Sequence, residues 1–294
     1  MKPALRTTTA RAAAVLVTSL LAVAAAPAAG AAPAAPPEAA GAAAGDVDRQ
    51  LLDPRITESS GLARSGYDDE LLWTHNDRGH AAELFQVGPD GRTRATVTLG
   101  GVTAVDWEAL SRWKDRTGTP RLFVADIGDN TRTRDEIVVH EIAEPAVSGD
   151  VTIPSGEVTT YRFRYASGRY DAETLMVHPW TGRLYVVTKS FYGGRVFEAP
   201  EKLSTTGVNV LHQVAEAPAT VTDGTFLFDG RMVLRDYQSA YVSWGPGEPA
   251  VTVPLPATSQ GESLAPLPGN AGVYVGSEGW SSPVYRQSLP VPPG

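Results

Sequence analysis

Short runs of apolar residues, separated by turns rich in glycine and proline, recur from about residue 46 to the C-terminus. The runs are rich in Val, Leu, Phe, Tyr and Trp, a composition typical of β-strands. Turn signals such as Pro89-Asp90-Gly91, Pro179-Trp180-Thr181-Gly182 and Asp229-Gly230 lie between them. No long amphipathic helical pattern interrupts the runs. The pattern therefore predicts an all-β domain.

A repeat underlies this pattern. Five segments each place a polar or acidic residue before a small residue and then a large apolar one. They are Ser59-Ser60-Gly61-Leu62-Ala63, Asp106-Trp107-Glu108-Ala109-Leu110, Asp171-Ala172-Glu173-Thr174-Leu175, Thr222-Asp223-Gly224-Thr225-Phe226 and Gln260-Gly261-Glu262-Ser263-Leu264. Aligned on the large apolar residue, successive segments lie 48, 65, 51 and 38 residues apart. These spacings average close to the ~40 to 50 residues of a four-stranded propeller blade.

Further strands are expected after each segment. The second strands are expected at 71–74, 122–125, 184–188, 232–234 and 273–276, and the third at 82–87, 137–142, 195–199, 240–244 and 284–287. The fourth strands are expected at 94–99, 158–165, 210–216 and 250–255. The last repeat lacks a fourth strand, whereas residues 48–52 precede the first repeat without an assignment. We therefore expect a five-bladed β-propeller closed by an N-terminal strand. A six-bladed β-propeller is the alternative, because the 65-residue spacing could hide a degenerate blade.

The N-terminal residues have the pattern of an export signal. Residues 1–31 are predicted to be a Sec-type signal peptide, with basic residues, an apolar stretch over 12–26 and the small-residue triplet Ala29-Gly30-Ala31 at the cleavage site. Residues 32–45 contain only Ala, Pro, Gly and one Glu and are expected to be a disordered linker. Residues 46–294 are expected to form a single propeller domain. We expect a secreted, extracellular protein, a monomer with no membrane span after cleavage.

The amino-acid composition limits the ligands and metal ions that the protein is expected to bind. The chain has 25 basic and 33 acidic residues, a net charge of −8, and the predicted leader carries Lys2, Arg6 and Arg11, so its removal leaves a net charge of −11. An acidic chain with scattered basic residues is not expected to bind a nucleic-acid polymer. The chain has no cysteine, which excludes disulfides, thiolate zinc sites and a cysteine nucleophile. A bound metal would need oxygen or histidine ligands, which favours a hard cation.

The repeat predicts a metal site in the channel. The first strand of a blade lines the channel, so its early residues should meet around one axis. The predicted metal ligands are Ser60, Glu108, Glu173 and Glu262, while the fourth repeat leaves its ligand open between Asp223 and Thr225. Carboxylates gathered in a narrow channel repel one another unless a cation or a proton intervenes. We therefore expect a Ca²⁺ ion, although water or nearby basic residues could bridge the carboxylates instead.

Polar residues also cluster where the second strands are expected to end. Asp77, Asp126, Lys189 and Arg235 are predicted as catalytic residues, and His75, Asn76, Asp129, Asn130, Glu278 and Trp280 as ligand-binding residues. The end of the second strand emerges beside the start of the first, so both sets should share one mouth of the channel. Loops on a rigid scaffold commonly carry function. The alternative for each Asp is that it only accepts hydrogen bonds from turn amides.

Two resemblances follow from these motifs. The segments Thr74-His75-Asn76-Asp77, Asp106-Trp107-Glu108, Asp126-Ile127-Gly128-Asp129-Asn130, Asp171-Ala172-Glu173 and Gly261-Glu262-Ser263 resemble secreted actinobacterial β-propeller proteins of mostly unassigned function. The order Ser, Glu, Glu, variable, Glu is similar to the calcium-activated nucleotidases, or apyrases. That resemblance implies a central calcium held by Ser60, Glu108, Glu173 and Glu262, with Asp77, Lys189 and Arg235 at the mouth. Gly224 departs from the apyrase pattern, and the loops do not reproduce that family's nucleotide-binding sequences.

Two functional hypotheses follow. In the first, the mouth binds a small anionic or polyhydroxylated (carbohydrate-like) ligand, and the protein is a calcium-dependent hydrolase of phosphoesters. In the second, it is a non-catalytic binding or scaffolding propeller of the cell envelope, with a purely structural ion or a water-filled channel. The sequence alone does not choose between these hypotheses, because a shared fold does not carry function.

Overall fold

The computed structural model describes residues 45–146 and 148–294. The predicted signal peptide and all of the predicted linker except Gly45 lie outside these residues. Almost all regular structure in the described part is β-strand. The helical segments there are two short 3₁₀ turns, Ser155–Glu157 and Pro268–Asn270, neither of them long enough to cross a bilayer. The prediction of an all-β chain is confirmed.

The strands form antiparallel groups of four, which we number I to V. Group I contains β2 (Ser59–Arg64), β3 (Leu72–Asn76), β4 (Glu83–Val87) and β5 (Thr93–Leu99). Group II contains β6 (Trp107–Lys114), β7 (Pro120–Asp126), β8 (Ile137–Ala143) and β10 (Thr159–Tyr165). Group III contains β11 (Ala172–Val177), β12 (Leu184–Thr188), β13 (Gly194–Glu198) and β14 (Val208–Ala217).

The last two groups follow the same plan. Group IV contains β15 (Asp223–Phe226), β16 (Met232–Arg235), β17 (Ser239–Ser243) and β18 (Val251–Pro254). Group V contains β19 (Ser263–Pro266), β20 (Gly272–Gly276), β21 (Pro283–Ser288) and the N-terminal β1 (Asp46–Gln50). The expected second, third and fourth strands lie within about two residues of those observed, because each is a short run rich in apolar residues between two clear turns.

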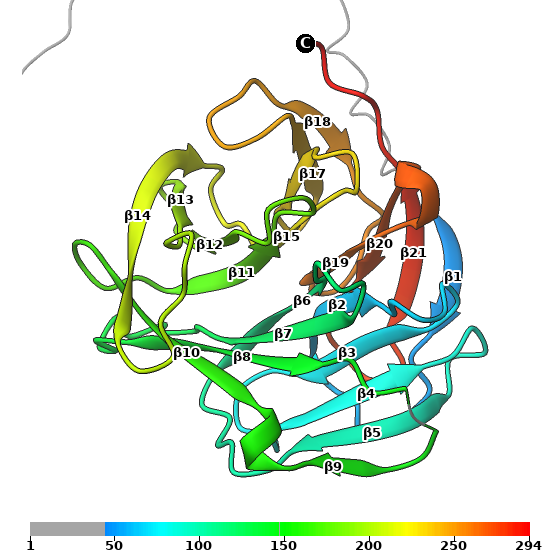
Figure 1. The fold of residues 1–294 in the computed structure, drawn as a ribbon. Coiled ribbons are helices and arrows are strands. Elements are labelled where there is room, and N and C mark those ends of the chain that lie inside the picture. Colours follow the sequence, from blue (N-terminus) through cyan, green and yellow to red (C-terminus); the bar gives the residue numbers. More distant parts are fainter. Residues whose placement is uncertain (1–44, 147) are drawn as a thin grey trace, which may run out of the picture. The chain divides into compact units, whose positions relative to one another are not determined.

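The first strands of the groups form a ring. In chain order β2, β6, β11, β15 and β19 each contact the next, and β19 contacts β2. Figure 1 shows these strands at the centre, with β5, β14 and β18 farther out. Apolar clusters fill the spaces between successive groups, as where Trp73 of group I and Trp107 of group II are both buried. Sheets stacked side by side around a ring of first strands have the architecture of a β-propeller.

The N-terminal strand closes this ring. β1 pairs antiparallel with β21, on the outer edge of group V, as the unassigned residues before the first repeat predicted. The buried Arg49 of β1 also donates from Nη1 to the carbonyl oxygens of Glu70 and Val87 in group I, at 2.8 and 3.1 Å. The strand ladder therefore joins the two ends of the domain, and the hydrogen bonds of Arg49 connect group V to group I.

The long second spacing has a local explanation. Residues between β8 and β10 form an additional short strand, β9 (Val151–Ile153), which pairs in parallel with β5 of group I. A second parallel pairing, between β10 and β14, joins groups II and III into one sheet of eight strands. The extra residues thus extend an existing sheet. The sequence analysis did not predict β9, because a three-residue strand lacks a period that can be recognised.

Candidate functional site

The starts of the first strands lie at one end of the channel. Hydrogen bonds link equivalent positions of neighbouring groups: Ser60 Oγ donates to the Glu108 carbonyl at 2.9 Å, and Thr222 Oγ1 donates to the Gly261 carbonyl at 2.8 Å. Ser111 Oγ likewise donates to the Leu175 carbonyl, at 2.5 Å. Because the first residues of each of these strands contact the first residues of the next, the first strands run in a common direction. The early residues of the repeats therefore converge as predicted.

Three predicted ligands occupy β-bulges. Asn76 and His75 pair with Ser59 and Gly61, which leaves Ser60 as an extra residue in β2. Glu108 is the extra residue between Trp107 and Ala109 in β6, and Glu173 is the extra residue between Ala172 and Thr174 in β11. A bulge re-aims the side chain of the extra residue. The same local irregularity thus turns Ser60, Glu108 and Glu173 out of the regular alternation of their strands.

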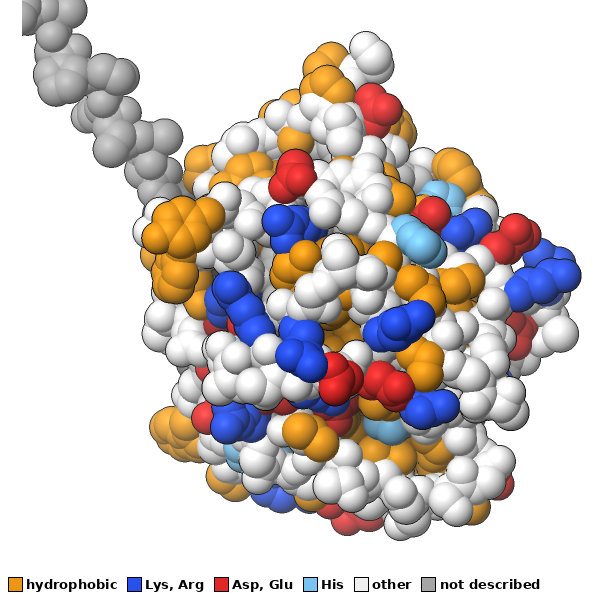
Figure 2. All heavy atoms as spheres, turned by 90° about the vertical axis from the view of Figure 1, so that its left-hand side faces the viewer, with side chains coloured by type: hydrophobic (Ala, Val, Ile, Leu, Met, Phe, Trp, Pro, Cys, Tyr) orange, Lys and Arg blue, Asp and Glu red, His pale blue; other side chains and the backbone are white. Residues whose placement is uncertain are grey.

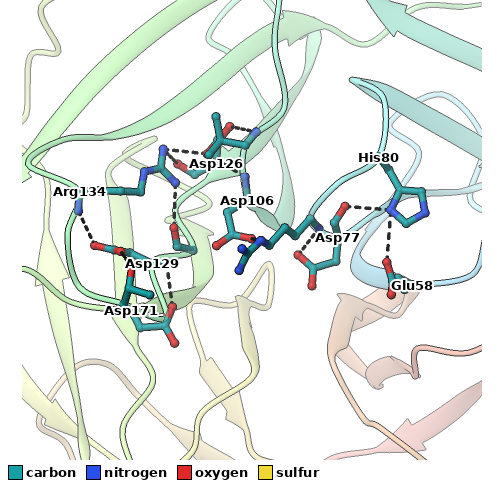
Figure 3. Close-up of polar contacts among 12 residues, drawn as sticks. Glu58, Asp77, His80, Asp106, Asp126, Asp129, Arg134 and Asp171 are labelled. Carbon is teal, nitrogen blue, oxygen red and sulfur yellow. Dashed lines mark hydrogen bonds and ion pairs between the residues drawn. The ribbon is translucent and has the colours of Figure 1, made fainter.

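We call this end of the channel the acidic mouth. A cluster of three carboxyl groups lies there. One ligand atom from each of Asp77, Asp106 and Glu108 lies within 4.8 Å of the other two. Asp77 follows β3, whereas Asp106 immediately precedes β6 and Glu108 lies within it. In Figure 3 an arginine side chain extends between the Asp106 and Asp77 side chains, and Glu58 and His80 lie beyond Asp77. The sequence analysis placed Asp77 and Glu108 in the site but did not assign Asp106.

These carboxyl groups carry perturbed pKa values. Burial, and then repulsion from Asp77, raises the pKa of Asp106 to about 6. Burial, and then repulsion from Glu173, raises the pKa of Glu108 well above its usual range. Burial is also the main cause of the raised pKa of Asp77. The site therefore favours either protons or a cation over three bare negative charges.

Two further observations fit a cation at this cluster. Oδ1 of Asp106 is buried and accepts no hydrogen bond from the described residues, and its nearest basic atom, Nε of the largely exposed Arg78, is 3.9 Å away. Gly128 provides the space: a Cβ there would approach Glu108 Oε1 and Asp106 Oδ2, the latter to 2.6 Å. A side chain at residue 128 would fill the space in front of both carboxylates. Three oxygen donors around an open space suit a hard cation such as Ca²⁺.

The opposite side of the acidic mouth contains a lysine between carboxylates. Lys189 Nζ donates to both oxygens of Glu173, at 2.6 and 2.7 Å, and lies 5.2 Å from the ring centroid of Tyr237. Burial and repulsion from Glu262 raise the pKa of Glu173, while the attraction of Lys189 lowers it. Burial likewise raises the pKa of Glu262. The glutamates of groups III and V therefore face a common space with one cationic side chain in it.

Glu278 lies in the same mouth, beyond the end of β20. Burial is the largest cause of its raised pKa of about 8, followed by repulsion from Glu262 and Asp77. Gln260 Nε2 donates to Glu278 Oε2 at 2.5 Å. The other carboxylate oxygen of Glu278, Oε1, can carry a proton near neutral pH.

Two predicted site residues hold the loop after β7. Asp126 Oδ2 accepts a hydrogen bond from the Val105 amide at 2.8 Å, and its Oδ1 lies 2.8 Å from Nη2 of Arg134. Asp129 accepts from the amides of Thr133 and Arg134, at 2.9 and 2.8 Å. Figure 3 shows Arg134 reaching between Asp126 and Asp129. Asp126 and Asp129 therefore accept hydrogen bonds from loop amides, which is the alternative that the sequence analysis gave for each Asp.

Other predicted residues are buried between groups. His75 is fully buried against Trp107, and burial lowers its pKa to about 4, so it is neutral at physiological pH. Asn76 is bonded to the backbone before β2, accepting the Glu58 amide at 3.0 Å. Arg235 is fully buried, and its Nη1 donates to the Gly276 carbonyl at 3.0 Å. The structure does not bring these three side chains to the surface of the mouth.

The remaining predicted residues differ in exposure. Asn130 and Trp280 are exposed, the latter with 71% of its surface accessible. In the fourth repeat, Asp223 carries the carboxylate, and its Oδ2 accepts a hydrogen bond from the Leu264 amide at 2.6 Å. Gly224 lies in regular register opposite Leu234, without a bulge. Group IV therefore departs from the pattern of groups I to III and ties its carboxylate to the backbone of group V.

Asp106 and Asp171 are site residues that the sequence analysis missed. Each lies two residues before a bulged glutamate, so the spacing Asp-x-Glu in the second and third repeats was the available signal. Asp171 Oδ1 accepts a hydrogen bond from the Asp129 amide at 2.9 Å, and Figure 3 shows the two side by side. The sequence does not show that Asp77, after the second strand of group I, lies next to the start of the first strand of group II, where Asp106 is.

Comparisons with known proteins show limited likeness. No family model and no curated protein matches the chain. Among solved structures, a gluconolactonase from Xanthomonas campestris is similar over 81% of this chain and 89% of its own, with 11% identity and a TM-score of 0.47. A glutaminyl cyclase from Myxococcus xanthus is similar over 83% of this chain and 97% of its own, with 11% identity and a TM-score of 0.47. A luciferin-regenerating enzyme is similar over 81% and 93%, with 12% identity and a TM-score of 0.46. Likeness at this level carries no inference about function.

Proposed function

We propose that the chain is a five-bladed β-propeller whose acidic mouth binds Ca²⁺ and hydrolyses a small phosphoester. Groups I to V correspond to the proposed blades, and the strand β1 on the edge of group V supports closure after five. The predicted signal peptide would place this activity outside the cell.

The observation that carries the proposal is the cluster of Asp77, Asp106 and Glu108, with mutual distances within 4.8 Å. Ca²⁺ takes six to eight oxygen ligands, of which this chain would supply a minority and leave positions for water and substrate. Asp106 and Glu108 are almost completely buried, so leaving both ionised without a cation would be costly. In this proposal Ser60 supports Glu108 through the backbone, and Glu173 is paired with Lys189.

A bound Ca²⁺ would supply the positive charge that a phosphoryl oxygen needs on an otherwise acidic surface. The chain's own residues would do the rest. Lys189, oriented by the two oxygens of Glu173, can donate a hydrogen bond to an anionic group in the mouth. Glu278, whose pKa is raised first by burial, can hold a proton at Oε1 for the oxygen that leaves when a water molecule attacks the phosphorus. Positioning and charge stabilisation are the main requirements of phosphoryl transfer.

The second candidate is a non-catalytic binding or scaffolding propeller of the cell envelope. It is favoured by the Glu173–Lys189 ion pair, which already neutralises one of the predicted metal ligands. In that case the carboxylates and their ion would only hold the blades together. With a structural ion the second candidate makes the same prediction for calcium binding, whereas with a water-filled channel it predicts none; both versions predict no turnover.

The experiment measures calcium binding and hydrolysis on the same protein. Calorimetry in metal-free buffer should detect Ca²⁺ binding that Glu108→Gln abolishes and Glu201→Gln, which removes an exposed carboxylate after β13, leaves intact. Phosphate release from nucleotides, phytate and sugar phosphates should then require Ca²⁺ and be lost in Glu108→Gln. Binding of Ca²⁺ without turnover of any of these substrates would support the scaffold. Absence of Ca²⁺ binding would remove both metal-dependent candidates.

A further inference from the structure

We propose that the opposite end of the channel binds a small tetrahedral oxyanion, either free phosphate or sulfate or the phosphoryl group of a small molecule. The ends of the first strands β2, β6, β11, β15 and β19 meet there around a cavity of about 80 Å³. Its lining includes the basic residues Arg64, Arg112 and Lys114 and the aromatic residue Phe228. This basic end is separate from the acidic mouth and does not depend on the function proposed above.

Two arginines converge on one aromatic ring in this cavity. The guanidinium carbon atoms of Arg64 and Arg112 each lie 5.2 Å from the ring centroid of Phe228. The two guanidinium groups are therefore no farther apart than twice that distance. Phe228 favours each cation through its π face. It contributes no negative charge, however, and does not neutralise the pair.

The two arginines have little anionic compensation. Arg64 pairs with the exposed Asp69 and donates from Nε to the Pro266 carbonyl at 3.2 Å. The Arg112 backbone belongs to the β6–β7 ladder, but its guanidinium makes no hydrogen bond or ion pair with any residue in 45–146 or 148–294. Burial is the main cause of the lowered pKa of each, and proximity to Arg112 is a further cause for Arg64. Arg112 is thus a partly desolvated cation with hydrogen-bond donors to spare.

The nearest buried carboxylate is already occupied. Glu144 Oε1 accepts from Ser65 Oγ at 2.5 Å and from Trp73 Nε1 at 2.9 Å, and its Oε2 accepts from the Gly66 amide at 2.8 Å. Glu144 acts on Arg112 only at longer range. Arg112 is half-buried, so its charge is partly desolvated, and an anion supplied from solution would offset part of that desolvation cost.

The size of the cavity and its basic lining indicate which ligand it can bind. A space of about 80 Å³ is larger than the room one water needs but too small for a nucleotide. Guanidinium groups match the oxygens of phosphate in a fork geometry, and their hydrogen bonds to an anion are charge-assisted. Lys114, at the end of β6, adds a third positive charge at the rim. Together these features fit a small oxyanion of high charge density.

The acidic mouth and the basic end share the same strand. Glu108 and Arg112 are four residues apart in β6, about 13 Å at the usual rise per residue of a strand. The channel therefore carries carboxylates at one end and guanidinium groups at the other. The outer face differs. Figure 2 views the molecule from the left-hand side of Figure 1, and on that face basic and acidic side chains are interspersed. The separation of charge belongs to the channel rather than to that outer face.

The test is binding of inorganic phosphate in metal-free buffer at constant ionic strength, measured by calorimetry and by thermal unfolding. Wild type should bind phosphate and melt at a higher temperature in its presence. Arg112→Gln should weaken binding at least about tenfold, since it removes a charge-assisted contact. Arg92→Gln, which removes an exposed arginine from the turn between β4 and β5, is the matched control and should bind as wild type does. Repeating the titration with glycerol phosphate shows whether the site takes the free anion or a phosphoryl group.

A second readout keeps the inference testable. Because the Arg112 guanidinium has no partner, Arg112→Gln should melt at the same or a higher temperature than wild type when phosphate is absent. If it fails to fold, Arg64→Gln provides the second variant for the same titration. Glu108→Gln should leave phosphate binding intact, which separates this site from the acidic mouth. Absence of phosphate binding, or binding equally weakened by Arg112→Gln and Arg92→Gln, would overturn the inference.

Discussion

Lys189 Nζ donates hydrogen bonds to both carboxylate oxygens of Glu173, at 2.6 and 2.7 Å. This pair joins the end of the second strand of group III to the bulged residue of its first strand, and so unites the two predicted rings of residues at the acidic mouth. The ion pair also distinguishes Glu173 from the other acidic residues of the mouth. Glu173 has its counter-ion within the protein, whereas Asp77, Asp106 and Glu108 form the cluster that fits a cation.

Calcium should stabilise the protein through that cluster. At a free Ca²⁺ concentration 100-fold above the dissociation constant, the free energy of unfolding should rise by about 2.7 kcal/mol. For a domain of this size the melting temperature should rise by roughly 5 to 10 °C. Differential scanning calorimetry with Ca²⁺ and with chelator measures this shift. A melting temperature that is the same in both conditions would remove the metal from the site.

Gly128→Ala should disrupt calcium binding without touching a charge. The new Cβ would approach oxygens of Glu108 and Asp106 and push both carboxylates away. We expect calcium affinity to fall at least about tenfold, the result of losing one charged contact. Gly245→Ala is the matched control, because a Cβ there meets no atom within 4 Å. Equal calcium affinities for the two variants would mean that the cation does not bind in front of Gly128.

Ser60→Ala separates a supporting role from a ligand role. The variant loses the hydrogen bond from Ser60 Oγ to the Glu108 carbonyl, so the free energy of unfolding should fall by about 1 kcal/mol. Calcium affinity should remain within about twofold of wild type if Ser60 only supports the backbone. Chemical denaturation and calorimetry measure the two quantities. A large loss of affinity would instead make Ser60 a metal ligand, as the sequence analysis predicted.

Glu278 should make the metal-free protein less stable as the pH rises. Its pKa is about 8 in the folded protein against 4.5 in a model compound, so between these values the folded state binds more protons than the unfolded state. Stability therefore falls as pH increases from about 5 to 8. Glu262, Asp77 and Glu58 raise this pKa, and Lys189 lowers it.

The measurement is a series of melting temperatures from pH 5 to 8 in metal-free buffer. Glu278→Gln should flatten the upper part of the profile, since glutamine does not titrate. Glu201→Gln, in which an exposed carboxylate is removed, should leave the profile unchanged. A wild-type profile that rises towards pH 8 would contradict the assignment.

Lys189→Met should show what the Glu173 pair contributes. The variant leaves the buried Glu173 without its counter-ion, and breaking a buried pair typically costs about 3 to 5 kcal/mol. The pKa of Glu173 should rise further, so part of the lost stability should return at low pH. Denaturation at pH 5 and pH 8 compares the two states. The double variant Lys189→Met with Glu173→Gln should recover stability, because it removes the unpaired charge.

The order and positions of the strands could be predicted from the sequence by itself. Apolar runs between turns place β12 at its observed residues 184–188, and the unassigned N-terminal residues predict the strand β1 that pairs with β21. The repeat also brings Glu108 and Glu173 to one end of the channel. These features depend on local periodicity and on chain connectivity, and both can be recognised in the sequence.

Only the tertiary structure decided which side chains are free to act. Arg235 and His75 lie at the ends of apolar strands, and Lys189 follows directly after one, yet packing between neighbouring groups buries the first two completely. Asp106 lies near Asp77 because β3 and β6 of neighbouring groups contact each other, and Gly128 leaves space for the carboxylates of Asp106 and Glu108. Burial, bulges and contacts between groups depend on residues far apart in the chain. One sequence without its fold does not specify them.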